Sequence, residues 1–265
     1  MKIIFSPAKE MSLDHPLASD WQLNSKSQAV VQALQSLSPE AVANTLKVKD
    51  KLLATNLAYI QAFDQERTYP AIRLYHGLAY RQLDLDLSDA SIKTYLKDQV
   101  RILSALYGPI PATQPIKAYR LDLSMPLKVA GQSLRKFWQG AFDQAFEPGE
   151  TVLNLASQEF ASLLDPDRYD WIDVDFYQVK DGKRKQHSTT AKKGRGQLLN
   201  YLINHQVTDL SQVKAFNEAG YRYLAQESNA HHLTFIKKAW VSGRSKWGKF
   251  QEKFCYSQPF MVNYP

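Results

Sequence analysis

Five consecutive residues, Lys192-Lys193-Gly194-Arg195-Gly196, combine three cations with two glycines. Glycine lets the backbone approach a ligand closely, and the free N–H groups at the start of a helix favour an anion. Alternating apolar residues predict a strand over 171–179, and leucines at helical spacing predict a helix over 191–205. The segment therefore has the composition of a phosphate site at a strand-to-helix transition. The alternative is a basic loop whose glycines only make a turn.

Polar side chains also follow two predicted strands at their carboxyl ends, where crevices form in sheet proteins. Lys9 comes shortly after the apolar run 2–5 and is therefore a cation held close to the sheet. Ser157 and Glu159 follow the apolar run 151–155. Such groups can serve as hydrogen-bonding or acid–base residues. The alternative, which we favour, is that Ser157 caps a helix with Glu159 in its first turn.

Lys117 and Arg120 follow a helix that is predicted over 88–107, where apolar residues recur at helical spacing until Gly108-Pro109 ends it. A helix, a tight turn with glycine and a basic second segment resemble the helix-hairpin-helix element, which offers backbone amides to a DNA phosphate. The match is partial, because prolines in the turn lack the N–H donor.

Several catalytic and metal-binding motifs are missing from the sequence. It contains no phosphate loop of the G-x-x-x-x-G-K type, no G-x-S-x-G, no H-E-x-x-H and no C-x-x-C. No Glu stands three residues before a His, so the usual di-iron helix pair is not encoded. His231 and His232 are adjacent and point apart. We therefore predict no bound metal or cofactor and assign no catalytic residue.

The positive charge of the chain is regional. The sequence holds 33 Lys and Arg against 26 Asp and Glu, a formal net charge of +7. The segment 180–195 has seven basic residues against Asp181, and 237–253 has six against Glu252, so the remainder is net acidic. Regional basicity favours a polyanionic partner. The alternative is a solvated lysine-rich surface.

The elements that must position these residues mix helices and strands without strict alternation. The 265 residues suffice for one large domain with its own core. Capping residues and apolar spacing predict further helices at 38–46, 50–63 and 134–146. An Asp181-Gly182 turn predicts a hairpin that returns over 184–190. We therefore expect an α+β fold, a single domain with a mixed sheet and surrounding helices.

The sequence also indicates where the protein resides. No apolar run approaches the length of a membrane span, and Pro7 and Lys9 interrupt the N-terminus before a signal-peptide core. The lone Cys255 has no partner for an internal disulfide, which suits a reducing cytosol. We expect a soluble cytoplasmic protein without a membrane partner.

Seven short segments, taken in order, resemble the YaaA family of bacterial peroxide-stress proteins. The resemblance runs from Met1 to about Lys237. It is carried by Ser6-Pro7-Ala8-Lys9, Leu103-Ser104-Ala105-Leu106-Tyr107-Gly108, Ala118-Tyr119-Arg120-Leu121, Phe137-Trp138, Asn154-Leu155-Ala156-Ser157, Lys192-Lys193-Gly194-Arg195-Gly196 and Phe216-Asn217-Glu218-Ala219-Gly220-Tyr221. We assign 1–239 to this domain and 240–265 to a basic tail outside the resemblance.

The resemblance implies one α+β domain with a positively charged cleft and a helix-hairpin-helix-like element. It also implies binding of double-stranded DNA, and a role in limiting peroxide damage by lowering free intracellular iron. We expect one nucleic-acid-binding cleft, formed by Lys9, Lys117, Arg120, Lys192, Lys193, Gly194, Arg195 and Gly196. Contacts to phosphates carry no base information, so binding is expected to be largely independent of sequence.

Two other function classes stay open. One is an enzyme acting on a phosphorylated or nucleotide-like substrate, with Lys9, Ser157 and Glu159 beside a phosphate held at 194–196. The other is a partner-binding protein whose basic cleft meets an acidic protein. An open channel of duplex width favours DNA, whereas a closed pocket with convergent polar groups favours an enzyme.

The first prediction is that DNA affinity falls steeply with salt. If four to six cations contact phosphates, the slope of log affinity against log salt is expected to be about −4 to −5, from the release of ~0.9 counterions per contact. Fluorescence anisotropy of a labelled duplex, titrated at several salt concentrations, measures this slope. A slope near zero contradicts the DNA hypothesis.

Overall fold

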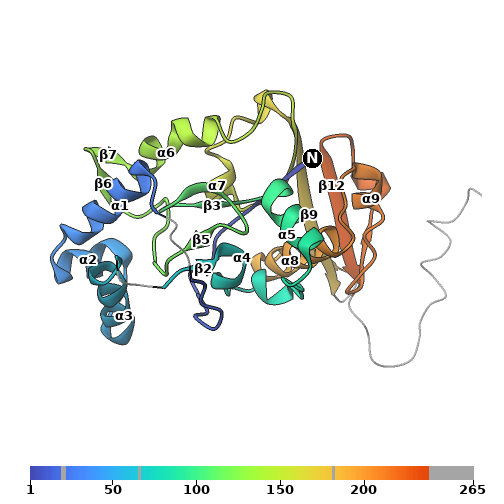
Figure 1. Ribbon diagram of the computed structural model, residues 1–265. Helices are drawn as coiled ribbons and strands as arrows, with labels where there is room; N and C mark the ends of the chain where they lie inside the picture. Colours follow the sequence, from blue (N-terminus) through green and yellow to red (C-terminus); the bar gives the residue numbers. More distant parts are fainter. Residues whose placement is uncertain (19–21, 65–66, 181–182, 239–265) are drawn as a thin grey trace, which may run out of the picture.

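A computed structural model describes residues 1–18, 22–64, 67–180 and 183–238 (Figure 1). Its centre is a mixed sheet in the order β11-β12-β9-β8-β1-β3-β4, with β10 paired to β9. Five neighbouring strands run parallel, and they are β12 (His232–Lys238), β9 (Asp170–Lys180), β8 (Thr151–Leu155), β1 (Lys2–Phe5) and β3 (Val100–Ser104). The antiparallel strands are β11 (Tyr221–Tyr223), β4 (Gly108–Pro111) and β10 (Lys183–Lys185). The expected α+β domain with a mixed sheet is confirmed.

The strand β1 lies in the middle of the sheet and is covered on both faces. Ile3 and Ile4 are fully buried, and Phe5 is nearly so. Its parallel neighbours are β3 on one side and β8 on the other. The chain visits β3 first and then crosses to β8, so the strand order reverses at β1. Ligand crevices in open sheets form at the carboxyl ends of the strands at such a reversal.

Helices cover the sheet, and a separate helical group stands at the end of the molecule away from β12 (Figure 1). This group consists of α1 (Ser25–Gln35), α2 (Pro39–Leu46) and α3 (Asp50–Gln61). The helices near the sheet are α4 (Ala71–Leu74), α5 (Ala90–Gln99), α6 (Leu134–Asp143), α7 (Gln158–Ala161), α8 (Ser188–Asn204) and α9 (Leu210–Lys214). The short 3-10 helices are η1 (Tyr80–Gln82), η2 (Pro166–Arg168) and η3 (Ala225–Glu227). Two small antiparallel sheets complete the fold. The first pairs β2 (Tyr69–Pro70) with β5 (Pro115–Ile116), and the second pairs β6 (Lys128–Val129) with β7 (Gln132–Ser133).

Local signals in the sequence explain several of these elements. Ser38 caps α2 by accepting a hydrogen bond from the N–H of Ala41, and Pro39 occupies the first helical turn. The predicted helices at 38–46, 50–63 and 134–146 are confirmed, and so are the strands at 2–5 and 151–155. No helix in the described ranges is long and apolar enough to cross a membrane.

The predicted helix over 88–107 is wrong in its second half. The helix α5 ends at Gln99, and Val100 begins β3, which pairs with β1 in the register Ile3 with Val100. Burial in the centre of the sheet overrides the helical spacing, because a strand covered on both faces is apolar throughout. Gly108, at φ 75°, then turns the chain from β3 into β4. Residues 105–107 therefore connect two strands, and the predicted turn between two helices does not lie here.

The segment 192–196 was expected at a helix start, and this is also wrong. The helix α8 begins at Ser188, so Gly194 and Gly196 lie inside it and their N–H groups are used within the helix. The return strand predicted over 184–190 is correspondingly short, since β10 ends at Lys185. The predicted Asp181-Gly182 turn and the tail 240–265 lie outside the described residues.

The two glycines of α8 serve close packing instead of a backbone anion cradle. A Cβ on Gly194 would lie 2.3 Å from the ring of Phe176 on β9. A Cβ on Gly196 would lie 2.1 Å from the carbonyl oxygen of Ala79, next to η1. Both distances are much shorter than a van der Waals contact. The helix α8 can therefore pack this closely on the sheet and on η1 only because residues 194 and 196 have no side chain.

The second prediction concerns this packing. Gly196→Ala is expected to destabilise the protein by about 1–3 kcal/mol, because the clash with backbone forces α8 away from η1. Gly140→Ala is the matched control, since nothing lies within 4 Å of its added Cβ in α6, and it is expected to gain about 0.5–1 kcal/mol. Chemical unfolding of both variants compares them. Equal stabilities contradict the packing role.

Candidate functional site

The carboxyl ends of β1 and β8 meet through two serines. The hydroxyl of Ser6 donates to the hydroxyl of Ser157 at 3.1 Å and accepts the N–H of Ser157 at 2.7 Å. The hydroxyl of Tyr80, in η1, donates to the carbonyl of Ser6 at 2.8 Å. Ser157 stands at the N-cap of α7 but makes no side-chain cap hydrogen bond. Its hydroxyl is therefore directed to the strand ends and not to the helix.

Lys9 follows β1 as expected, but its charge is already paired. Its Nζ lies 2.6 Å from a carboxylate oxygen of Asp122, whose side chain is only 11% exposed. Glu159, which follows β8, accepts the N–H of Ser124 at 3.3 Å, and its carbonyl accepts Arg135 at 2.8 Å. The loop around 122–124 is thus fastened to the ends of both strands. Lys9 and Glu159 hold this loop.

A buried hydroxyl network supports the same region from inside. Tyr119 Oη lies 2.7 Å from Ser104 Oγ and 2.7 Å from Tyr75 Oη. Ser104, the last residue of β3, also accepts the N–H groups of Leu106 and Tyr107. Burial raises the pKa of Tyr119 to about 12, so its hydroxyl stays protonated. The network explains why serine and tyrosine stand in these otherwise apolar segments.

Lys117 and Arg120 lie against the helical group α1–α3. Lys117 Nζ donates to the carbonyl of Phe63, just after α3, and lies 5.3 Å from the centre of its ring. Arg120 lines a small cavity with residues of α1 and α3, and its buried Nε has no hydrogen-bond partner among the described residues. Both residues therefore hold the helical group on the sheet, with only part of their surface open to a ligand.

The other predicted cations lie on α8. Lys192 and Lys193 are exposed, whereas Arg195 is half-buried. No hydrogen bond or ion pair between described residues joins these three to Lys9, Lys117 or Arg120. The predicted residues thus fall into two groups. Lys192, Lys193 and Arg195 lie on α8, whereas Lys117 and Arg120 lie in the loop at 117–122, to which Lys9 is joined through Asp122. Their shared role in DNA binding stays a prediction.

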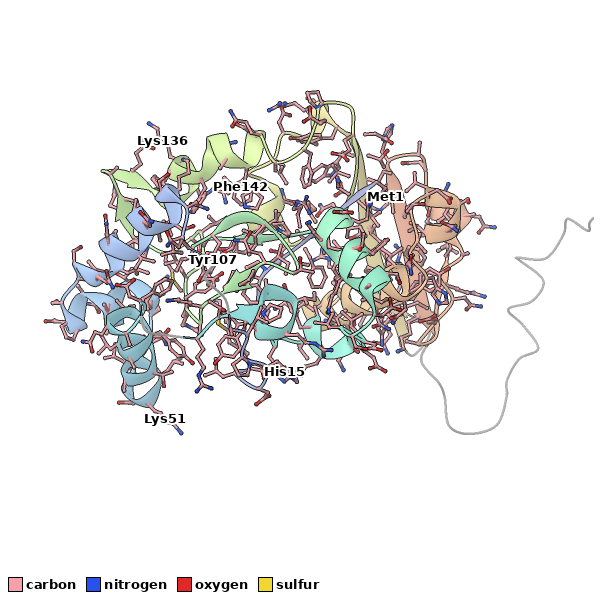
Figure 2. All side chains as sticks on the ribbon, viewed as in Figure 1. Met1, His15, Lys51, Tyr107, Lys136 and Phe142 are labelled. Atoms are coloured by element: carbon pink, nitrogen blue, oxygen red, sulfur yellow. The ribbon has the colours of Figure 1, made fainter. Side chains whose placement is uncertain are left out.

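The sequence also contains a helical hairpin that its turn residues did not reveal. The helices α2 and α3 are joined by Lys47-Val48-Lys49, with Lys47 in the left-handed conformation at φ 52° and Val48 buried beneath the turn. Lys47, Lys49 and Lys51 are all exposed, and Figure 2 shows Lys51 pointing away from the molecule. Both helices were predicted separately, and the signal that was missed is the short basic turn between them.

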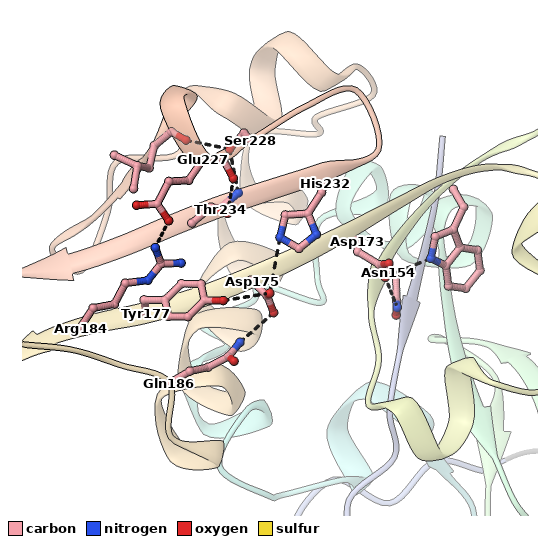
Figure 3. A network of polar contacts seen from close by, with 12 residues as sticks. Asn154, Asp173, Asp175, Tyr177, Arg184, Gln186, Glu227, Ser228, His232 and Thr234 are labelled. Atoms are coloured by element: carbon pink, nitrogen blue, oxygen red, sulfur yellow. Dashed lines mark hydrogen bonds and ion pairs between the residues drawn. The ribbon is translucent and has the colours of Figure 1, made fainter.

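A polar network lines one face of β9 (Figure 3). Asp173 accepts Asn154 Nδ2 at 2.8 Å and Trp171 Nε1 at 3.0 Å. Asp175 accepts Gln186 Nε2 at 2.8 Å and lies 3.4 Å from His232 Nε2. In the described ranges no group of three or more His, Cys, Asp or Glu side chains could hold a metal ion.

The fold and these residues define a class: an α+β protein with polar groups gathered at the strand ends of a mixed sheet. The family model described as "Peroxide stress protein YaaA" matches residues 1–227. The chain is 36% identical over 241 residues to a UPF0246 protein of Streptococcus pneumoniae strain ATCC 700669, covering 90% of this chain and 100% of the relative. A UPF0246 protein of strain P1031 is 35% identical over the same coverage. The chain belongs to the YaaA family of peroxide stress proteins.

The third prediction tests the hydroxyl network. Tyr119→Phe is expected to cost about 1–3 kcal/mol of stability, because Ser104 and Tyr75 each lose a buried partner. Tyr223→Phe is the matched control, since the Tyr223 hydroxyl makes no hydrogen bond with a described residue and it is expected to cost almost nothing. Urea unfolding compares the two. Similar midpoints for both variants contradict the network's role.

Proposed function

We propose that this protein binds double-stranded DNA without sequence preference as part of the peroxide stress response. The family supports the oxidative stress role. The DNA part of the proposal depends on one observation, the hairpin α2–α3 with three exposed lysines around its turn. In the same proposal the protein helps to limit free intracellular iron, as the family resemblance implies.

The start of α3 has the properties of a phosphate contact. The first N–H groups of a helix have no partner within it, and Lys49, at the N-cap, makes no side-chain cap hydrogen bond. The N–H of Leu52 already donates to the carbonyl of Lys49 at 3.1 Å, so the N–H groups of Asp50 and Lys51 are the ones left for a phosphate. The exposed carboxylate of Asp50 in the same turn opposes an anion, and the flanking Lys47, Lys49 and Lys51 outweigh its charge. In this proposal the two helices and the turn between them serve as the helix-hairpin-helix-like element, at 39–61 instead of 88–120.

Further exposed cations extend the surface that DNA would contact. Lys192 and Lys193 project from α8 into solvent, and Lys9 keeps 57% of its side chain exposed despite its ion pair. Exposed lysines contact phosphates at little cost in desolvation, and they read no bases. Binding of this kind depends strongly on salt.

The fourth prediction tests the hairpin. Lys49→Ala with Lys51→Ala is expected to weaken duplex binding and to lower the magnitude of the salt slope by about 1.8, or ~0.9 for each lost phosphate contact. The matched control is Lys93→Ala with Lys97→Ala, which removes the same charge from exposed positions on α5. Fluorescence anisotropy with one labelled duplex measures both.

The comparison separates a specific surface from general charge. If Lys93→Ala with Lys97→Ala weakens duplex binding as much as Lys49→Ala with Lys51→Ala does, the hairpin is not the DNA contact and net charge alone determines the affinity. If neither pair changes the affinity, the proposal is wrong for these elements.

A further inference from the structure

One edge of β9 is open between two strand partners. On this edge β8 pairs with residues 170–173 of β9, and β10 pairs with 178–180. The opposite edge is covered by β12 along 173–179. Residues 174–177, which we name the β9 gap, therefore have no strand partner on the β8 side among the described residues. The gap begins where β8 ends, beside the serines at the strand ends.

Backbone polar groups face the β9 gap. The N–H of Asp173 donates to the carbonyl of His231 at 3.0 Å, so odd-numbered residues of β9 direct their backbone groups to β12. The backbone groups of the even-numbered residues Val174 and Phe176 point the other way, into the gap. Buried backbone groups normally have a partner, so the gap offers hydrogen-bonding capacity that the sheet itself leaves unused.

The packing of α8 indicates where Arg195 lies. Gly194 lies against Phe176 of β9, and Gly196 lies against Ala79 beside η1. Successive helix positions are about 100° apart, so the position of Arg195 on the helix is between these two contacts. Its burial and its electrostatic interaction with Asp173 and Asp175 are consistent with a position on the side of α8 that faces β9.

Arg195 has no partner there. Its Nε is buried without a hydrogen-bond acceptor, and the guanidinium makes no hydrogen bond or ion pair with any described residue. Burial lowers its pKa, and the carboxylates of Asp175 and Asp173 oppose that shift from a distance. Both carboxylates are already occupied by their own donors (Figure 3). A partly buried cation thus stands without an anion in contact among the described residues.

The serines at the strand ends are connected to the elements that flank Arg195. On one side, Asn154 near the end of β8 donates a hydrogen bond to Asp173 of β9. On the other side, Tyr80 donates to the carbonyl of Ser6, and its neighbour Ala79 lies against Gly196 of α8. Since the Ser6 hydroxyl donates to Ser157, the hydroxyl hydrogen of Ser157 is still free to donate.

We propose that the β9 gap binds a phosphate group of a small molecule, with Arg195 and Ser157 as donors. A guanidinium presents a planar fork that matches the oxygens of a phosphate. Asp173 and Asp175 repel every phosphate that approaches them, and this repulsion is smaller for a molecule with one phosphate group than for the DNA backbone. We therefore assign a small phosphorylated molecule as the ligand. This site is separate from the proposed DNA surface on the hairpin.

The fifth prediction uses Arg195→Gln, with Lys97→Gln as the matched control at an exposed position on α5. Inorganic phosphate is the probe, titrated at constant ionic strength while the melting temperature is followed. Phosphate is expected to raise the melting temperature of the unmodified chain and of Lys97→Gln. It is expected to bind Arg195→Gln at least tenfold more weakly. Without phosphate, Arg195→Gln is expected to melt at the same or a higher temperature, because an unpartnered buried charge is removed.

Each alternative outcome overturns the proposal. If phosphate stabilises Arg195→Gln as strongly as the unmodified chain, the anion binds elsewhere. If the unmodified chain does not respond to phosphate, the gap is not a phosphate site. If Arg195→Gln melts markedly lower without phosphate, Arg195 is a structural residue. Duplex binding by Arg195→Gln is measured in parallel, and retention of that binding shows that the two sites are independent.

Discussion

The parallel pairing of β1 with β3 and β8 is the constraint on which the rest of the structure depends. Ile3, Ile4 and Phe5 of β1 are apolar and buried, on both faces of the strand, so helices must cover both sides of the sheet. The chain reaches β3 before β8, and the strand order therefore reverses at β1. That reversal brings Ser6 and Ser157 together, and through them the loops that carry Lys9 and Glu159.

The position of α8 is the second consequence of this sheet. The helix has to approach Phe176 and η1 more closely than side chains allow, and glycine at 194 and 196 makes that possible. Because Arg195 stands between them, the same packing that buries α8 carries a guanidinium into the sheet edge. The strand β8 ends before the middle of β9, so nothing in the sheet occupies the position that Arg195 faces.

The accuracy of the sequence predictions follows from how many structures each pattern allows. Ser38 and Pro39 are specific to a helix start, and the strands at 2–5 and 151–155 are short apolar runs between turn residues. The run from Val100 to Tyr107 fits a helix and a buried strand equally well, and only its pairing with β1 decides. Glycine in 194–196 indicates a close approach, but the sequence does not tell whether a ligand or another element approaches. The basic turn at 47–49 was missed because it contains no glycine.

The cations of this chain fall into two physical classes with different consequences. Lys49, Lys51 and Lys193 are solvated, so they cost little and attract any polyanion in a salt-dependent way. Arg195 is partly buried, and its Nε has no hydrogen-bond partner among the described residues, so its burial costs stability. Residues that lower the stability of the fold and make no stabilising hydrogen bond or ion pair are the ones expected at functional sites. The basic composition therefore supports the proposed DNA surface, whereas the partly buried guanidinium of Arg195 is the stronger sign of a specific ligand.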